Sequence, residues 1–389
     1  MIVAGVMSGT SADGINVALV RIEEHSSRPG RTYGRDISVK LIGHAEYPYP
    51  RNVRHFILSA MNSASARVAD LARLNFLLPE LYAEAVLATE KRFGKKAKLV
   101  GCHGQTLYHQ GEAAAFLGRK LAVTWQSGDG SVLATRLEVP VVSDFRPADM
   151  AAGGKGAPLV PLFDFFLYRD SRQGRIAQNL GGIANLTAIP ASTSPDEILA
   201  FDTGPGNMVM DAVTERLFHR PYDRDGKIAA GGKVLDPIVA QVLREPFFRR
   251  KPPKTAGREE FGRDFVEALL GRCRRARARD IVATATALTA RSIGDALRRF
   301  VLGRTGQYRE YIVSGGGVRN STLMAMLAKE VAPLGLVISS SEEFGIPSQA
   351  KEAAAFALLA YQTWQRRPSN LPSATGARRP ALLGKVSYG

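Results

Sequence analysis

The sequence predicts an α/β protein made of two related domains, each with a sheet of parallel or mixed strands covered by helices. Three observations predict this fold class. The chain has 389 residues, which is too many for one ordinary hydrophobic core. Apolar runs of strand length alternate with segments of helical spacing almost throughout. Both halves also open with a strand pair joined by a polar glycine turn, which indicates two domains of similar structure.

The first half is predicted to open with a meander of three strands, followed by a helical segment and two short buried strands. Apolar residues recur at helical spacing over residues 65–93, where Pro79 predicts a break or a kink. Residues 103–106 follow one buried strand and residues 144–146 follow the other, at the edge where open α/β sheets bind ligands. The strands are expected at residues 2–6, 17–22, 38–46, 99–102 and 139–143.

The second half shows the same alternation of strands and helices. The tail from Arg366 onward is rich in Pro, Ser and Gly, and we expect it to lie along the surface. The strands are expected at residues 176–180, 186–189, 198–201, 311–313 and 336–338, and the helices at 208–217, 261–277, 283–300 and 351–364.

The composition is that of an ordinary globular protein, with 45% hydrophobic and 23% charged residues. The two cysteines, Cys102 and Cys273, have no ligand spacing around them, which argues against a disulfide framework or a zinc site and fits a reducing compartment. No signal peptide and no apolar run of about 18 residues is visible in the sequence. We therefore expect a cytoplasmic protein without a membrane partner.

Glycine-rich turns with hydroxyl or amide side chains follow apolar runs at three places, residues 8–14, 181–185 and 314–317. Glycine lets the backbone approach a polyanion closely and direct N–H groups at it, and Ser and Thr add further donors. Three such turns in one chain predict a cleft that holds a nucleotide from both sides. This pattern is typical of a phosphoryl-transfer enzyme.

The net charge of +16 allows two interpretations of the basic clusters. They form either a surface for nucleic acid or another polyanion, or solvated helix faces. Because they lack interleaved aromatic residues for base stacking, we expect no nucleic-acid partner. The positive charge can still attract ATP and an anionic substrate. The clusters are at residues 249–251, 272–279, 366–367 and 378–379.

Asp202 is the candidate general base. It follows an apolar strand and precedes a Gly-Pro-Gly turn, which fixes the backbone and leaves room for a ligand. The alternative is that Asp202 caps the helix starting near Asn207, but Asn207 itself is the more natural cap. Asp13, in the first glycine turn, either contacts a phosphate-bound magnesium ion or braces the turn.

Other polar residues are candidates for binding a substrate. Arg146, between Asp144 and Asp149, either orients a substrate carboxylate by bidentate hydrogen bonds or forms an internal salt bridge. His103 is a lone histidine, which is more often structural, although the Gln105–Thr106 pair beside it suits recognition of sugar hydroxyls. Glu352 opens the last predicted helix, where the helix dipole favours an acidic residue.

Taken together, these motifs resemble those of the anhydro-N-acetylmuramic acid kinases. The resemblance covers essentially the whole chain in order. The matching segments are residues 5–14 (GVMSGTSADG), 103–106 (HGQT), 144–146 (DFR), 156–161 (GAPLVP), 179–185 (NLGGIAN), 201–207 (FDTGPGN), 255–259 (TAGRE) and 370–376 (NLPSATG).

The resemblance implies the fold of actin, hexokinase and Hsp70, with two RNase H-like domains and ATP in the cleft between them. Domain I would comprise residues 1–170 and 348–389, with the nucleotide loop, the sugar-site residues and the returning C-terminal helix. Domain II, residues 171–347, would carry the second phosphate turn, the catalytic Asp and an adenosine-side glycine turn. The implied enzyme is a phosphotransferase that converts 1,6-anhydro-N-acetylmuramic acid, ATP and water into N-acetylmuramic acid 6-phosphate and ADP, in the recycling of cell-wall sugars.

The resemblance also assigns roles to residues. Asp202 would be the general base that activates water, and Mg²⁺ would accompany ATP, with Asp13 as its candidate contact. A homodimer is one option for the assembly. The nucleotide would be bound by Gly9, Thr10, Ser11, Ala12, Asp13, Gly14, Ile15 and Asn16, and by Gly181, Gly182, Asn185, Gly315, Gly316 and Gly317. The sugar would be bound by His103, Gln105, Arg146, Asp149, Gly204, Pro205, Gly206, Asn207 and Glu352.

The chain departs from the usual family pattern at three positions. The family usually has Leu and Asp where this chain has Ala12 and Asn16, and Gln where it has Lys155. The Asn16 change would weaken metal handling if that carboxylate were used, and Lys155 either alters the substrate pocket or faces solvent. A same-fold kinase for another sugar and a non-catalytic nucleotide-binding regulator are the alternatives, but the intact Asp202 turn argues against the regulator.

Overall fold

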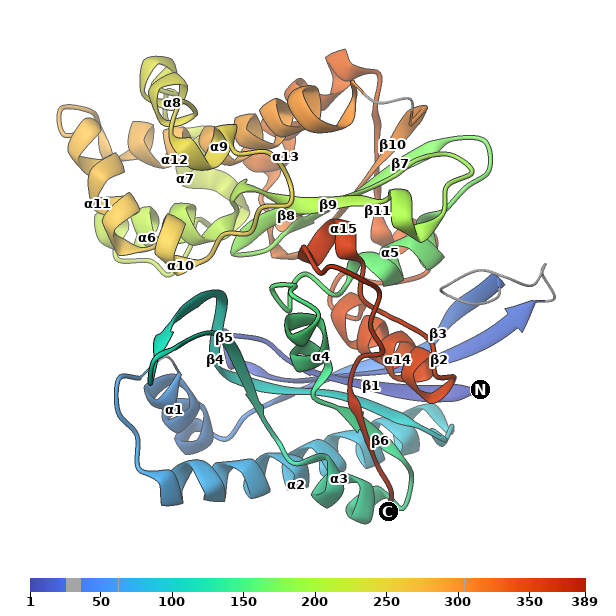
Figure 1. The fold of residues 1–389 in the computed structure, drawn as a ribbon. Helices are drawn as coiled ribbons and strands as arrows, with labels where there is room; N and C mark the ends of the chain where they lie inside the picture. Colours follow the sequence, from blue (N-terminus) through green and yellow to red (C-terminus); the bar gives the residue numbers. More distant parts are fainter. Residues whose placement is uncertain (26–35, 62, 304–305) are drawn as a thin grey trace. The chain divides into compact units, whose positions relative to one another are not determined.

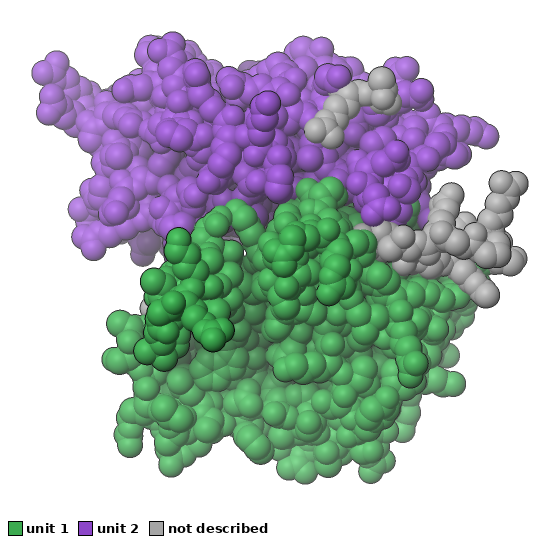
Figure 2. Space-filling model, in the orientation of Figure 1, with its two compact units in different colours: residues 1–167, 345–389 green, residues 168–344 purple. Residues whose placement is uncertain are grey.

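The computed structural model describes residues 1–25, 36–61, 63–303 and 306–389. The chain divides into two compact units, which Figure 2 distinguishes by colour. Unit 1 comprises residues 1–167 and 345–389, and unit 2 comprises residues 168–344. The first segment of unit 1 ends at residue 167, whereas residue 170 was expected. Its second segment begins at residue 345, whereas residue 348 was expected.

Unit 1 contains a mixed sheet in the order β12-β6-β4-β1-β2-β3, with β5 paired to β4 (Figure 1). The first three strands are antiparallel neighbours, whereas β4 runs parallel to β1, and β6 parallel to β4. The strands are β1 (Ile2–Ser8), β2 (Gly14–His25), β3 (Asp36–Pro48), β4 (Val100–Phe116), β5 (Arg119–Ser127), β6 (Val141–Ser143) and β12 (Lys385–Ser387). The helices are α1 (Arg51–Ala60), α2 (Val68–Phe93), α3 (Gly130–Leu137), α4 (Phe145–Ala151), α5 (Pro161–Tyr168), α14 (Lys351–Trp364) and α15 (Pro372–Thr375).

Unit 2 contains a five-stranded sheet in the order β11-β10-β7-β8-β9. Its strands are β7 (Gly174–Leu180), β8 (Ile183–Ile189), β9 (Leu199–Pro205), β10 (Tyr308–Ser314) and β11 (Val337–Ser340). Its helices are α6 (Asn207–Phe218), α7 (Lys227–Ala230), α8 (Asp236–Val242), α9 (Pro246–Arg249), α10 (Arg258–Phe261), α11 (Arg263–Arg272), α12 (Ala278–Ala296) and α13 (Ser321–Val331). Short 3-10 and π turns are η1 (Pro195–Glu197), η2 (Arg224–Gly226), η3 (Leu297–Val301), η4 (Gly316–Arg319), η5 (Ala332–Leu334) and η6 (Ser341–Phe344).

The core strands of the two units have the same topology. When each set is counted along the chain, omitting the added strands β5 and β12, both sheets have the order 3-2-1-4-5. In unit 2, as in unit 1, the first three strands are antiparallel, and the fourth and fifth run parallel to the first. This is the RNase H-like arrangement of actin- and hexokinase-type proteins, so the predicted fold class is confirmed.

Helix α14 packs on the sheet of unit 1 with almost no space between the two backbones. A Cβ atom at Gly5 of β1 would lie 1.7 Å from the carbonyl oxygen of Ala353, and one at Gly101 of β4 would lie 2.2 Å from that of Phe356. The two glycines therefore allow α14 to contact the main chain of the central strands. Figure 1 shows α14 on one face of this sheet and α2 on the other.

Helix α2 runs through Pro79 without a break, so of the two predicted alternatives, a break or a kink, the break is wrong. A proline inside a helix leaves the carbonyl four residues earlier without its usual donor. Here that carbonyl belongs to Asn75 and accepts a hydrogen bond from Asp129 N at 3.0 Å. The Asn75 side chain also accepts one from Gly128 N at 2.9 Å. The loop before α3 thus provides the hydrogen bonding that the proline removes.

Two other expectations for unit 1 are corrected by the structure. Residues 103–106 lie inside β4 and not after a strand, because β4 continues into a hairpin with β5 that the weakly patterned residues 107–116 did not predict. The tail from Arg366 was expected along the surface, but Ser369 and Asn370 are fully buried. The Asn370 side chain donates to Asp149 and accepts from Ala381 N, and β12 adds a strand next to β6.

In unit 2 the long predicted helices have different limits. The segment expected at 261–277 is two helices, α10 and α11, which are separated at the non-helical Gly262. The segment expected at 283–300 begins earlier, at Ala278, and ends in the π turn η3. None of the described helices combines the length and hydrophobicity needed to cross a membrane.

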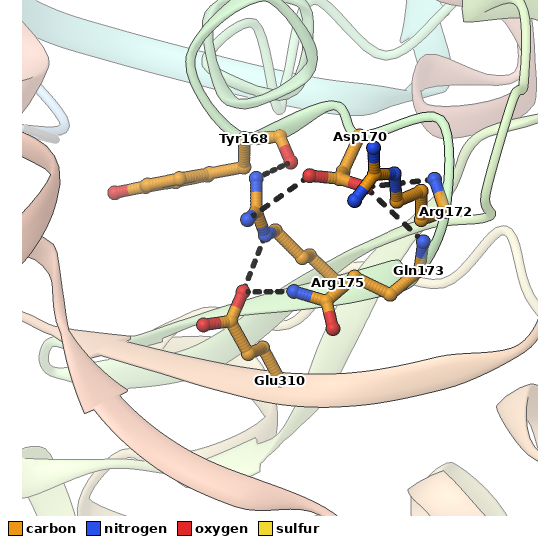
Figure 3. A network of polar contacts seen from close by, with 6 residues as sticks. All are labelled: Tyr168, Asp170, Arg172, Gln173, Arg175 and Glu310. Carbon is orange, nitrogen blue, oxygen red and sulfur yellow. Dashed lines mark hydrogen bonds and ion pairs between the residues drawn. The ribbon is translucent and has the colours of Figure 1, made fainter.

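A polar network joins the start of unit 2 to its sheet (Figure 3). Arg175 on β7 donates to the Tyr168 carbonyl at 3.1 Å and pairs with both Asp170 and Glu310 of β10. Gln173 donates to Glu310 as well, at 3.0 Å. One arginine therefore holds the entering segment against two parallel strands.

We predict that Gly5→Ala destabilises unit 1 by about 3 kcal/mol or more, because the added Cβ overlaps the α14 backbone. The two tryptophans of the chain, Trp125 and Trp364, both lie in unit 1, so their fluorescence during urea unfolding reports on this unit. Gly94→Asn is the control, since Gly94 has open space and a left-handed conformation that Asn tolerates. Equal unfolding midpoints for the two variants would contradict the close packing.

Candidate functional site

The first glycine turn connects β1 to β2 and is supported by hydrogen bonds among polar side chains next to it. Ser8 donates to Gln105 Oε1 at 2.6 Å, and Gln105 Nε2 donates to the Gly9 carbonyl at 3.2 Å. Tyr49 donates to Ser8 Oγ at 3.0 Å. Of the predicted nucleotide loop, residues 9–13 form the turn, whereas Gly14, Ile15 and Asn16 already belong to β2. Gln105 thus contacts the turn itself.

A cavity of about 240 Å³ opens beside this turn. Three carboxylates reach it, from Asp13, Glu46 and Glu352, and its walls otherwise consist of polar or small residues apart from Met7. The surrounding protein raises the pKa of Glu352, and the positive charge of Arg146 opposes this shift. The cavity is lined by Met7, Gly9, Ser11, Asp13, Gly14, Asn16, Glu46, Gln349 and Glu352.

Asp13 and Asn16 both have partners at the rim of the cavity. Asp13 forms an ion pair with Arg54 at 2.9 Å, and its side chain is 71% exposed. Asn16 Oδ1 lies 3.0 Å from His44 Nε2. Burial lowers the pKa of His44, which favours a neutral ring next to the amide. Asp13 therefore braces the turn in this structure while keeping an exposed carboxylate.

Arg146 is oriented by a histidine and a carbonyl. Its Nε and Nη2 lie 3.1 and 2.9 Å from His103 Nε2, and its Nη1 donates to the Gly156 carbonyl at 2.7 Å. The described ion pairs include none with Arg146, so the predicted internal salt bridge is not present. Burial lowers the pKa of His103 well below its usual value, with Arg146 adding to the shift. A neutral His103 adds no negative charge beside the guanidinium, and the carboxylates of Glu352 and Asp149 act on it without a described ion pair.

Asp149 is fully buried and accepts hydrogen bonds through both oxygens. Oδ2 accepts from Gly156 N at 2.8 Å, while Oδ1 accepts from Asn370 Nδ2 and Thr375 Oγ1, both at 2.7 Å. It therefore joins the loop after α4 to the C-terminal tail. Lys155 in the same loop pairs with Glu112 of β4.

In unit 2 the glycine turns meet at one edge of the sheet. The parallel strands β7 and β10 end at Leu180 and Ser314, so the turns that follow them lie side by side. A Cβ atom at Gly317 would lie 2.7 Å from Leu180 Cβ, and Gly315 has a left-handed φ of 90°. The sheet edge thus collects Gly181, Gly182, Gly315, Gly316 and Gly317.

Helix α6 begins against the same turns. Asn207 N and Met208 N donate to the carbonyls of Gly181 and Gly182 at 2.8 and 3.1 Å. The cap position is Gly206, and Asn207 is instead the first helical residue, donating through Nδ2 to the Leu180 carbonyl at 3.1 Å. The expectation that Asn207 caps the helix is therefore wrong.

The other residues predicted nearby lie on the antiparallel strands β8 and β9, except Gly206, which follows β9. Gly204, Pro205 and Gly206 are buried, and a Cβ atom at Gly204 would lie 2.6 Å from Ser292 Oγ of α12. Asn185 on β8 pairs with Asp202 on β9. The strand register thus places Asn185 beside the candidate base.

Asp202 lies inside β9, because this strand continues to Pro205, four residues beyond the predicted end at residue 201. Its Oδ2 accepts from Ala256 N at 2.7 Å, and its own N–H donates to the Lys254 carbonyl at 3.0 Å. Burial raises the pKa of Asp202 to about 7, although the Ala256 hydrogen bond and the charge of Lys254 act in the opposite direction. A carboxyl with this pKa can accept a proton near neutral pH.

Sequence reasoning did not single out Lys254 and Ala256. Residues 255–259 were noted only as a motif, and the position of Ala256 depends on a backbone contact that no residue type signals. Lys254 is 1% exposed, although lysine is rarely buried. The aromatic residues at 247 and 248 shortly before it were the available signal, but their contact with Lys254 requires the fold.

A family model and curated relatives match essentially the full length of the chain. A model of the family described as anhydro-N-acetylmuramic acid kinase matches residues 1–389. The anhydro-N-acetylmuramic acid kinase of Bacillus cereus (strain AH187) is 44% identical over 391 residues, covering 100% of this chain and 99% of the relative. That of Caldanaerobacter subterraneus subsp. tengcongensis is 41% identical over 395 residues, covering 99% and 96%. Among solved structures, the activator of the 2-hydroxyisocaproyl-CoA dehydratase from Clostridium difficile aligns over 94% of this chain and 96% of its own, at 14% identity and a TM-score of 0.43.

We predict that Asp149→Asn lowers the free energy of unfolding of unit 1 by about 2–3 kcal/mol, because an amide NH₂ would face a donor in a buried site. Urea unfolding followed by tryptophan fluorescence measures the change. Asp144→Asn is the control, since Asp144 makes a partly exposed ion pair with Lys385 that is worth at most about 1 kcal/mol. A loss no larger than that of the control would refute the role of Asp149.

Proposed function

The chain belongs to the anhydro-N-acetylmuramic acid kinase family, and we propose that it phosphorylates 1,6-anhydro-N-acetylmuramic acid with ATP while water opens the anhydro bridge. The products are N-acetylmuramic acid 6-phosphate and ADP. The proposal rests on the full-length family match together with one local observation. Asp202 is a carboxyl with a pKa of about 7, held by a backbone N–H at a sheet edge.

In this mechanism Asp202 acts as the general base. Its carboxylate takes a proton from water as the water oxygen bonds to the anomeric carbon and the bond from that carbon to O6 breaks. The freed O6 then bonds to the γ-phosphorus of ATP, and the bond to the β-phosphate oxygen breaks to release ADP. Because Ala256 N binds Oδ2, the other oxygen is the one available to the water.

The glycine turns are the candidates for binding the nucleotide. In unit 1, the candidate for its phosphates is the turn at residues 9–13, and in unit 2 the candidates are the turns at 181–182 and 315–317 with Asn185. The described residues contain no cluster of three His, Cys, Asp or Glu side chains able to hold a metal ion. Mg²⁺ would therefore arrive with ATP and keep phosphate and water ligands, with the exposed Asp13 as a candidate contact.

The sugar would contact Arg146 and Glu352 directly. The described ion pairs include none between Arg146 and a carboxylate of the protein. Its guanidinium is therefore suited to bind the carboxylate of the substrate. His103, Gln105 and Asp149 already bond to protein groups, so we assign them positioning roles. Gly204, Pro205, Gly206 and Asn207 would shape the backbone beside Asp202.

We predict that the purified protein releases ADP from Mg-ATP only when 1,6-anhydro-N-acetylmuramic acid is present, and that Asp202→Asn slows this release by about 100-fold or more. A coupled ADP assay measures both. Asp211→Asn is the matched control, because burial also raises the pKa of Asp211, to about 6, but the mechanism does not use it. No sugar-dependent release from the unmodified protein would refute the proposed function.

We also predict that kcat rises with pH through about 7 and levels off above it. The base is the ionised carboxylate of Asp202, and burial raises the pKa of that carboxyl to about 7, so the active form is lost as the pH falls. Initial rates at saturating substrates between pH 5.5 and 8.5 (roughly the range bracketing such a pKa) test this. Asp211→Asn should keep the same profile, and a profile that is flat across this range would exclude Asp202 as the titrating base.

A further inference from the structure

A buried lysine lies next to the proposed base. The Lys254 ammonium is surrounded by three aromatic rings, with Nζ 4.6 Å from the centroid of Phe247, 5.1 Å from that of Phe300 and 5.7 Å from that of Phe201. Nζ also donates to the Phe247 carbonyl at 3.2 Å. The described ion pairs include none with Lys254. Ring faces and carbonyl oxygens stabilise the cation here in place of a carboxylate.

This arrangement links three elements around the base. Phe201 precedes Asp202 on β9, Phe247 is on α9, and Phe300 is in the π turn η3. The side chain of Lys254 is anchored among them, and its own carbonyl accepts the Asp202 N–H. Two residues later, Ala256 N donates to the Asp202 carboxyl. The ammonium therefore fixes the segment whose backbone binds Asp202 on two sides.

A buried charge without an ion-pair partner is costly, and a methionine would fill the same space without that cost. The presence of a charged lysine at this buried position therefore indicates an electrostatic role. We propose that Lys254 is a positioning residue for Asp202, which anchors residues 254–256 against the base and favours its ionised form through the nearby positive charge. The catalytic part of this inference rests on the proposed function.

Other charges face this pair and must be separated from the effect of Lys254. Glu259 and Glu260, at α10, raise the pKa of Asp202, in the direction opposite to Lys254. Burial lowers the pKa of Lys254 to about 8; Arg250 and Arg299 add to this shift, and Asp295 and Asp202 oppose it. The test consequently changes Lys254 alone and leaves these groups in place.

The first experiment compares Lys254→Met with Lys251→Met. Both remove one positive charge from the same loop, but Lys251 is exposed. We expect the carboxyl ¹³C signal of Asp202, identified by its absence in Asp202→Asn, to titrate about half a unit to one unit higher in Lys254→Met. The kcat profile should shift by the same amount while KM for the sugar changes less than about twofold. Lys251→Met should leave both unchanged.

A purely structural role for Lys254 predicts no change in the Asp202 titration, and that result would overturn the proposal. If Lys254→Met does not fold, the reciprocal measurement decides, because the coupling of two titrating groups is symmetric. In Asp202→Asn, the Lys254 ¹³Cε signal should titrate lower by a similar amount, and an unchanged midpoint would refute the coupling. The NMR titrations need no turnover, so they test the pair even if the sugar is not a substrate.

Discussion

Unit 1 depends on the contact between two main chains, that of α14 and that of the central strands β1 and β4. Glycine at positions 5 and 101 lets carbonyls of the helix lie where any side chain would place a Cβ atom. The alanines that make up much of α14 serve the same close approach from the helix side. This contact brings Glu352 and Gln349 to the first glycine turn, so the composition of the cavity follows from the packing of one helix.

The fold was largely predictable because its signals are periodic. Alternating strands and helices predicted an α/β fold with parallel or mixed sheets, and the meander of unit 1 and the last helix were found close to their observed limits. Two of the failures have a common cause, since both depend on partners distant in sequence. Pro79 is tolerated because Asp129 supplies a donor to Asn75, and the polar tail is buried because Asp149 binds Asn370 and Thr375.

The candidate site was predictable at the level of residue types but not of contacts. The glycine turns were predictable because glycine indicates positions with an unusual backbone conformation. Asp202 was predictable because a carboxylate directly after an apolar run is visible in the sequence. The sequence does not show whether a polar side chain contacts a ligand or another protein group. His103 and Asp149 both bond to other protein groups in the structure, and Lys254 is recognised only from the rings around it.

The discontinuity of unit 1 has a consequence for how the protein is made. Residues 168–344 are contiguous and contain a complete five-stranded sheet, so unit 2 can fold while later residues are still being synthesised. Unit 1 needs α14, and then Asn370, Thr375 and β12, before its sheet and its buried carboxylate have all their partners. During translation its N-terminal strands therefore lack these partners until residues 351–387 have left the ribosome, and chaperone binding or aggregation would compete with folding in this interval.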